Sequence, residues 1–195
     1  IMRNEHQDYT EEEEEVIRKG KEFYTKCISS KKFEELKSPD NRVKIRVAHV
    51  DGDSLVTGVI TTIADTSIEE CAAYEYIKNS RGNLATLAER MVFEQQIEQL
   101  SPHSQLFFSV RNFGLGLSKR EFRVKATWVK GDTIWIIYNN TDELNNKISH
   151  RPGNVLGAAT TTFLFEPLPK VGNTPQSRIT MVTKRDLRGN FPTSI

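Results

Sequence analysis

Cysteine is scarce in this chain of 195 residues, and no long hydrophobic run occurs in it. Cys27 and Cys71 lie far apart and form no CxxC pair, a pattern typical of reduced thiols in a cytosolic protein. No stretch approaches the ~18 apolar residues that a transmembrane helix needs. The polar, acidic N-terminus does not resemble a signal peptide. We therefore expect a cytoplasmic protein, at most peripheral to membranes.

A strong excess of charge of either sign is also lacking. The net charge is +1, which argues against a dedicated nucleic-acid binder. The charge is unevenly spread, because residues 1–100 carry 14 Lys/Arg against 20 Asp/Glu, whereas residues 101–195 carry 13 against 6. The basic half indicates a transient contact with an anionic membrane surface or an acidic partner. The alternative is a set of solvated basic loops without a partner.

Clusters of catalytic or metal-binding residues are missing as well. The four histidines are dispersed, and none has a Cys, Asp or Glu at the spacing of a metal site or a catalytic triad. The glycine-containing segment Gly114–Lys119 leads into a strand, whereas a phosphate-binding loop opens a helix. The sequence therefore predicts no catalytic residue, no metal and no cofactor.

Two helices are predicted from capping boxes. Thr10 and Glu13 open an amphipathic helix that continues to about residue 30, and we expect residues 1–30 to form a separate N-terminal element. Ser67 and Glu70 open a shorter helix that residues 79–83 break.

Most of the remaining chain alternates between apolar and polar residues, as half-buried strands do. Strands are expected near 33–37, 43–48, 55–63, 91–100, 105–111, 121–130, 133–139, 155–165 and 178–185. A Pro/Gly/Asn-rich connection over Glu166–Ser177 separates the last two. Strands that cluster together predict an antiparallel α+β protein.

The sequence ends in SRITMVTKRDLRGNFPTSI, residues 177–195. An apolar strand passes through a turn at Gly189 to Pro192, whose φ suits a first helical turn. The pattern indicates a strand that leads into a helix, but the sequence stops before that helix.

Four segments, in this order, resemble those of the START (StAR-related lipid transfer) domain. They are RVKIRVAHVDGDSLVTGVITTIADTSIEECAAYEYI, SKREFRVKATWVKGDTIWIIYNN, VLGAATTTFLFEPLP and the C-terminal segment above. The resemblance covers about residues 33–195 and implies a helix-grip fold, in which a curved antiparallel sheet wraps around a C-terminal helix and one hydrophobic ligand. We therefore expect a START-like domain over residues 31–195.

The sequence departs from the family where the C-terminal gripping helix is expected. The uncovered sheet suggests that the Thr10–Ser30 helix covers the concave face, or that a second copy forms a homodimer through it. Some family members carry a charged pair inside the cavity. The aligned positions here are Phe107 and Ala126, so the resemblance gives no such pair.

The resemblance implies that the apolar face of the sheet lines the ligand cavity, with a sterol or an acyl chain as the ligand class. The polar candidates for contacting the ligand head are Arg111, Tyr138, Thr160 and Thr162. The full expected lining is Phe108, Val110, Arg111, Phe122, Val124, Ala126, Trp128, Ile134, Ile136, Tyr138, Thr160 and Thr162.

Three functions remain open at this point. The first is non-catalytic binding of a lipid or other hydrophobic ligand, for transfer or for sensing within a larger protein. The second is a helix-grip enzyme, which needs titratable groups in the cavity. The third is a protein-interaction scaffold with a filled core. An internal cavity of several hundred Å³ would favour ligand binding over the scaffold.

Overall fold

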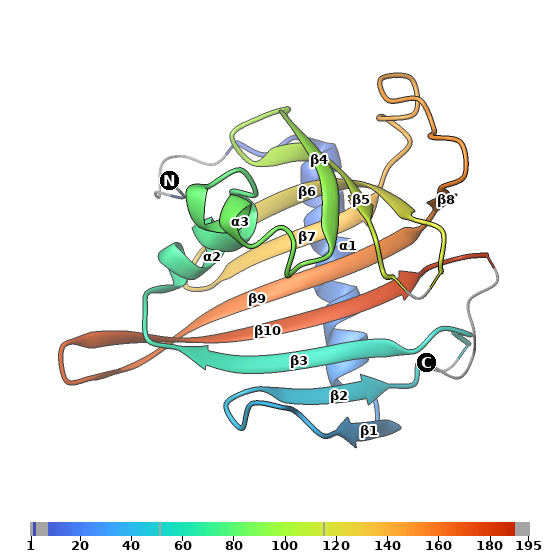
Figure 1. The fold of residues 1–195 in the computed structure, drawn as a ribbon. Coiled ribbons are helices and arrows are strands. Elements are labelled where there is room, and N and C mark those ends of the chain that lie inside the picture. Colours follow the sequence, from blue (N-terminus) through green and yellow to red (C-terminus); the bar gives the residue numbers. More distant parts are fainter. Residues whose placement is uncertain (1, 3–7, 51, 115, 190–195) are drawn as a thin grey trace.

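In the described part of the chain, the fold is dominated by one curved ten-stranded sheet that carries three helices (Figure 1). The computed structural model describes residues 2, 8–50, 52–114 and 116–189. The sheet order is β1-β2-β3-β10-β9-β7-β6-β5-β4; these neighbours are antiparallel, and β8 adds a short parallel pairing with β6. This architecture confirms the predicted antiparallel α+β class. The elements are α1 (Glu11–Ile28), β1 (Phe33–Leu36), β2 (Lys44–Ala48), β3 (Thr57–Ala64), α2 (Ile68–Tyr76), α3 (Arg81–Ala85), β4 (Val92–Gln99), β5 (Ser104–Arg111), β6 (Arg120–Lys130), β7 (Ile134–Asn140), β8 (Val155–Leu156), β9 (Ala158–Val171) and β10 (Thr174–Asp186).

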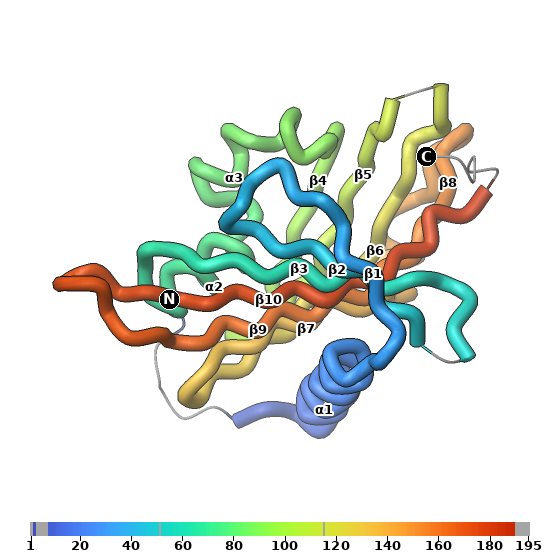
Figure 2. Tube along the Cα trace, turned by 90° about the horizontal axis from the view of Figure 1, so that it is seen from below, coloured from blue at the N-terminus to red at the C-terminus, as the bar shows by residue number. Residues whose placement is uncertain are grey.

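Helix α1 lies on one face of the sheet, opposite the face that carries α2 and α3 (Figure 2). Gly20 lets α1 approach closely, because a Cβ atom there would lie 2.4 Å from Cγ1 of Ile137. The Thr162 hydroxyl donates to the Gly20 carbonyl oxygen at 3.3 Å. The expectation that this helix covers the concave face is therefore wrong: α1 covers the convex face.

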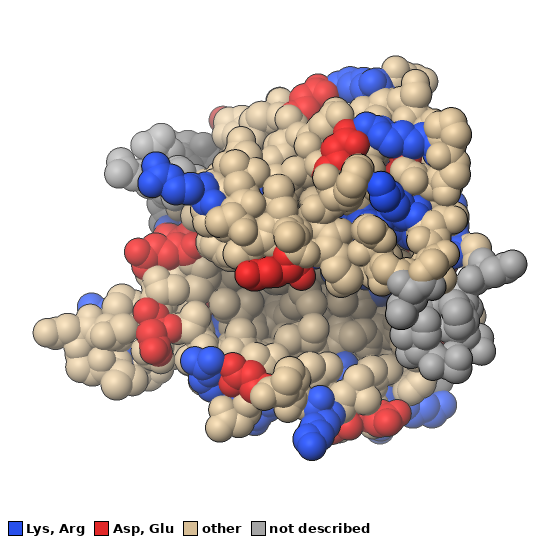
Figure 3. Space-filling model, in the orientation of Figure 1, with Lys and Arg blue, Asp and Glu red and all other residues tan. Residues whose placement is uncertain are grey.

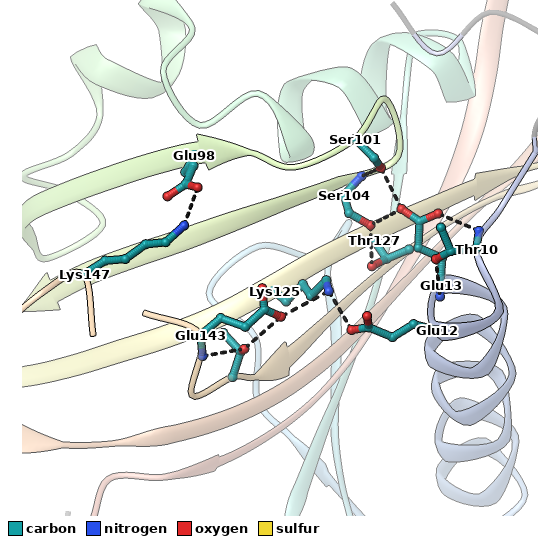
Figure 4. Close-up of polar contacts among 11 residues, drawn as sticks. Thr10, Glu12, Glu13, Glu98, Ser101, Ser104, Lys125, Thr127, Glu143 and Lys147 are labelled. Atoms are coloured by element: carbon teal, nitrogen blue, oxygen red, sulfur yellow. Dashed lines mark hydrogen bonds and ion pairs between the residues drawn. The ribbon is translucent and has the colours of Figure 1, made fainter. Parts of the chain in front are cut away.

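The N-terminus of α1 is joined to the turn between β4 and β5 (Figure 4). The predicted capping box is present, with the Glu13 amide donating to the Thr10 hydroxyl and the Thr10 amide donating to the Glu13 carboxylate. The other oxygen of the same carboxylate accepts from the hydroxyls of Ser101 at 2.6 Å and Ser104 at 2.7 Å. A residue of the helix cap thus also orders a distant turn.

Helix α3 lies where a break was predicted, at residues 79–83. Ser80 caps it by accepting from the Asn83 amide. The Asn83 side chain is fully buried and donates to the carbonyl oxygens of Tyr74 at 2.6 Å and Ile77 at 2.9 Å. These hydrogen bonds satisfy carbonyl groups at the C-terminal end of α2. The chain therefore turns there and continues as a second short helix.

Strands β9 and β10 form a longer hairpin than expected. Residues 166–177, predicted as an irregular connection, continue both strands to a tight turn between Val171 and Thr174. The pairing of β7 with β9 ends at Phe165, so beyond it no strand of the described residues pairs with β9 on that side. Pro167 and Pro169 therefore need not donate to a ladder there. This two-stranded ribbon projects from the sheet in Figure 1.

Three hydrophobic clusters hold these layers together. The largest fills the space between α2 and the concave face of the sheet and includes Ala72, Trp128 and Phe165. A second lies between α1 and the sheet around Cys27 and Val182. The third lies on the convex side of β5.

The C-terminal segment is described as far as Gly189, whose φ of 69° gives the predicted left-handed turn. The expected helical start at Phe191 and Pro192 lies outside the described residues. No described helix is both long and apolar enough to cross a membrane.

Candidate functional site

A cavity of about 400 Å³ lies between the concave face of the sheet and the segment that runs from α2 through α3 to Met91. The space-filling view shows this face of the molecule hollowed across its middle (Figure 3). The lining residues are Glu75, Lys78, Arg90, Met91, Phe107, Ser109, Arg111, Phe122, Val124, Tyr138, Ala159, Thr161, Phe163, Met181 and Arg185.

The sheet supplies an apolar and aromatic wall. Strand alternation places every second residue of a strand on this side, and the registers align Tyr138 with Thr161, and Phe163 with Met181. The rings of Tyr138 and Phe163 meet edge to face, with centroids 6.1 Å apart. Such a surface suits the hydrocarbon part of a ligand.

Helix α2 and the residue that follows it by two positions supply a buried ion pair. Lys78 pairs with Glu75, and the Tyr138 hydroxyl donates to the same carboxylate at 3.2 Å. The Lys78 ammonium lies 5.4 Å from the centroid of the Tyr138 ring. Burial lowers the pKa of Lys78, and burial together with the nearby Glu75 charge raises the pKa of Tyr138 well above its ordinary value.

Three arginines complete the polar part of the wall. Arg90 donates to the side-chain oxygen of Asn83. Arg111, at the end of β5, donates to the Arg90 carbonyl oxygen at 3.5 Å and lies over the Phe122 ring at 6.0 Å. Arg185 reaches the cavity from β10 and retains access to solvent.

Desolvation acts on two of these guanidinium groups, and repulsion from the other two arginines acts on Arg111. Desolvation, followed by the charges of Arg185 and Arg90, lowers the pKa of Arg111 to about 10. Desolvation also lowers the pKa of Arg185, although this residue is exposed to solvent. The cavity therefore has an apolar wall and a cationic region.

Eight of the predicted lining residues lie on the cavity side of the sheet. Arg111, Phe122, Val124 and Tyr138 contact the cavity itself. The other four pack against α2 in the main core and do not line the open space: Ala126, Trp128, Ile134 and Ile136. Helix α2 thus fills one end of the concave face and leaves the other end open.

The other four predicted residues point to the opposite face. Phe108 and Val110 belong to the convex cluster with Leu144, so the assumed phase of β5 is wrong by one residue. The strand SQLFFSVR is buried on both faces except at its last residue, and its sequence alone gives no phase. The register sets the phase by pairing Phe107 with Val124.

Thr160 and Thr162 are misplaced for a similar reason. Residues 160–162 are all threonine, so neither alternation nor hydropathy distinguishes the faces of β9. Thr161 lines the cavity, whereas the Thr162 hydroxyl bonds to α1. Thr160, by alternation, shares the convex face with Thr162.

Most of the charged lining was not predicted from the sequence. Glu75 and Lys78 come from α2 and the residues directly after it, and Arg90 comes from the turn after α3; none of the three was among the predicted lining residues. Two sequence patterns could have indicated these side chains. Glu75 and Lys78 are three positions apart, a spacing that places both on one face of a helix. Met181 and Arg185 are an even number of positions apart on β10, so they lie on the same face of the sheet.

Comparison with known proteins identifies the fold. No family model matches the sequence, and no curated protein matches it either. Human STARD10 superposes with a TM-score of 0.69 at 16% identity, over 97% of this chain and 73% of that chain. This chain has a START-like fold.

Two further solved structures agree with the START-like fold. The human StAR-related lipid transfer protein 5 has a TM-score of 0.69 at 15% identity, over 93% of this chain and 86% of that one. The human StarD13 (DLC2) lipid transfer and protein localization domain has a TM-score of 0.65 at 16% identity, over 95% and 87% of the two chains. The helix-grip resemblance read from the sequence is thus confirmed at the level of fold.

Proposed function

We propose that the protein binds a lipid or another hydrophobic ligand, without catalysis, in the cavity between the sheet and the α2–α3 segment. The observation that carries this proposal is the cavity of about 400 Å³ with its apolar and aromatic wall. Ligand pockets of proteins commonly have volumes of roughly 300–1,000 Å³ and walls of this kind.

The size of the cavity suits an acyl chain. A water molecule takes about 30 Å³ of liquid, so the cavity has room for about a dozen groups of that size. Each buried CH₂ contributes ~0.8 kcal/mol. A dozen methylenes would therefore offset a large part of the free energy that holds a single-chain lipid in a membrane.

The compared proteins support the ligand class. One is named as a lipid transfer protein and another as a lipid transfer and protein localization domain. By analogy, the present chain would transfer a lipid or would sense one as a regulatory module.

The two other candidate functions have less support. A cavity of this volume counts against a scaffold with a filled core. For a helix-grip enzyme, the comparisons give less support, because two of the proteins compared above are named for lipid transfer. The cavity volume and the names of the compared proteins together favour a binding role.

Native mass spectrometry of the purified protein, combined with organic extraction, tests the proposal. We expect one lipid molecule per chain, or uptake of one from a mixed lipid extract. Apo protein that takes up nothing from the extract would overturn lipid binding and favour the interaction scaffold.

Three related expectations stay predictions. They are the division into residues 1–30 and a START-like domain over 31–195, a transient contact with anionic membranes, and a homodimer through the sheet. Folding of residues 31–195 alone, vesicle flotation and sedimentation test them in turn.

A further inference from the structure

The charges around the cavity do not balance. Among the described lining residues there are four cationic side chains and a single carboxylate, that of Glu75. Glu75 is already paired with Lys78, which is itself almost fully buried. The three arginines therefore face the cavity without a carboxylate of their own in the described wall.

These arginines come from different parts of the chain and meet at one place. Arg90 follows α3, Arg111 ends β5 and Arg185 lies near the end of β10. The Arg111 guanidinium donates a hydrogen bond to the Arg90 carbonyl oxygen, and the positive charge of Arg185 acts on Arg111. Three guanidinium groups held close together in a partly desolvated site repel one another, and an anion placed among them would relieve this repulsion.

We infer that the ligand is an anionic amphiphile, whose carboxylate or phosphate head lies among Arg90, Arg111 and Arg185. This inference rests on the proposed binding of a lipid in the same cavity. The hydrocarbon chain then lies along Phe107, Phe163 and Met181 on the sheet wall. Guanidinium groups suit this head because their planar fork binds carboxylate and phosphate oxygens with two parallel hydrogen bonds.

The arrangement also selects against other lipids. A neutral alcohol of equal chain length fills the apolar part but leaves the three cations unmatched. A cationic amphiphile adds a like charge at short range, which costs free energy in a partly desolvated site. The expected order of affinity is therefore anionic first, neutral second and cationic last.

Equilibrium dialysis of the full chain at neutral pH with four radiolabelled probes tests this order. Hexadecanoate, hexadecyl phosphate, hexadecanol and hexadecylamine share one chain length and differ in the head. We expect both anionic probes to bind about tenfold to a hundredfold more tightly than hexadecanol, the range for charge-assisted hydrogen bonds. Hexadecanol bound as tightly as the anionic probes would overturn the inference and leave the proposed function intact. Binding of none of the four would overturn both.

Inorganic phosphate and acetate, added as competitors, separate a lipid head from a free anion. We expect neither to displace hexadecanoate at concentrations comparable to that of the lipid, because they lack the chain. Equal affinity for phosphate with and without a chain would mean an anion site, and the amphiphile would be rejected.

Two substitutions link the preference to the arginines. Arg111→Gln and Arg185→Gln should each weaken hexadecanoate binding about tenfold and leave hexadecanol binding within about twofold. The matched control is Arg178→Gln, which lies on β10 together with Arg185. Arg178 is exposed, lies near Glu166 and does not line the cavity, so this substitution should change neither affinity. An equal loss for both probes would point to a general structural effect and contradict the inference. Thermal unfolding of each variant establishes that it is folded.

Discussion

The Glu13 carboxylate accepts a hydrogen bond from the Ser104 hydroxyl at 2.7 Å, across 91 positions of sequence (Figure 4). One residue therefore caps α1 and also fixes the turn that leads into β5. Burial opposes the charged carboxylate, but the bonds from Ser101 and Ser104 outweigh burial and lower the pKa of Glu13. The charged form is thus the one that the folded protein stabilises.

Glu13→Gln should lower the free energy of unfolding by about 1–3 kcal/mol, because it removes charge-assisted hydrogen bonds to a buried group. Denaturant unfolding at neutral pH measures this loss. Because the folded pKa lies below 4.5, the contribution of Glu13 is complete above pH 4.5 and is lost as the pH falls through the folded pKa. The difference between the two proteins should therefore shrink at acidic pH, and a difference that is constant with pH would contradict this account. Glu11→Gln, on the exposed side of the same helical turn, is the control.

Gly20→Ala should destabilise the protein by about 1–3 kcal/mol through overpacking, although alanine favours a helix. The added Cβ would lie 2.4 Å from Cγ1 and 3.2 Å from Cβ of Ile137, and a β-branched side chain in a central strand has little freedom to move. The double variant Gly20→Ala/Ile137→Ala should be more stable than the sum of the two single effects predicts. Additive effects would show that the close approach does not limit the packing of α1. Unfolding curves of the four proteins give the coupling.

Ala159→Trp should abolish lipid uptake and change the free energy of unfolding by less than about 1 kcal/mol, because the ring enters open space instead of packed core. Ala158→Trp is the matched control, since strand alternation turns this neighbour to the convex face. Native mass spectrometry after incubation with a lipid extract compares the two variants. Uptake by Ala159→Trp equal to that of the unmodified protein would place the ligand elsewhere.

Alkaline pH should unfold the protein cooperatively. Burial raises the pKa of Tyr138 and Tyr76 above the ordinary value of 10.0, and raises the pKa of Tyr9 to about 12. The stability that these neutral phenols provide is complete below pH 10 and is lost as the pH rises toward their folded pKa values. Phenolate absorbance should therefore show a fraction of the tyrosines that ionises only with the loss of the far-ultraviolet circular dichroism signal. Ionisation of all tyrosines while the signal persists would contradict the burial of Tyr138.

The sequence was most informative where one face of an element is polar. In β6 the polar residues Arg123, Lys125 and Thr127 alternate with apolar ones and set the phase, and the turn at Gly131 sets the register with β7. The same holds for α1, whose capping box fixes its start at Thr10. The residues of β6 and β7 that face α2 and the cavity were predicted correctly, as was the start of α1, whereas the sheet face that α1 covers was not.

The phase was not predictable where both faces are buried or the side chains are alike. Phe107 and Phe108 are equally apolar, and only the packing of Leu144 on one side and the cavity on the other distinguishes them. The cationic region could not be predicted either, because Arg90, Arg111 and Arg185 are brought together by contacts between distant elements. No local pattern encodes such contacts.

The pairing of β3 with β10 has a consequence for how the chain folds during synthesis. Thr61 on β3 lies beside Thr180 on β10, 119 positions further along the chain. At a translation rate of roughly 5–20 residues per second, one edge of β3 waits on the order of 6–25 seconds for its partner. The segment containing β1, β2 and β3 is thus exposed in the nascent chain as a sheet fragment with an open edge, a form prone to wrong strand pairing. Because Met181 and Arg185 of β10 line the cavity, its wall is complete only after β10 has been synthesised and has joined the sheet.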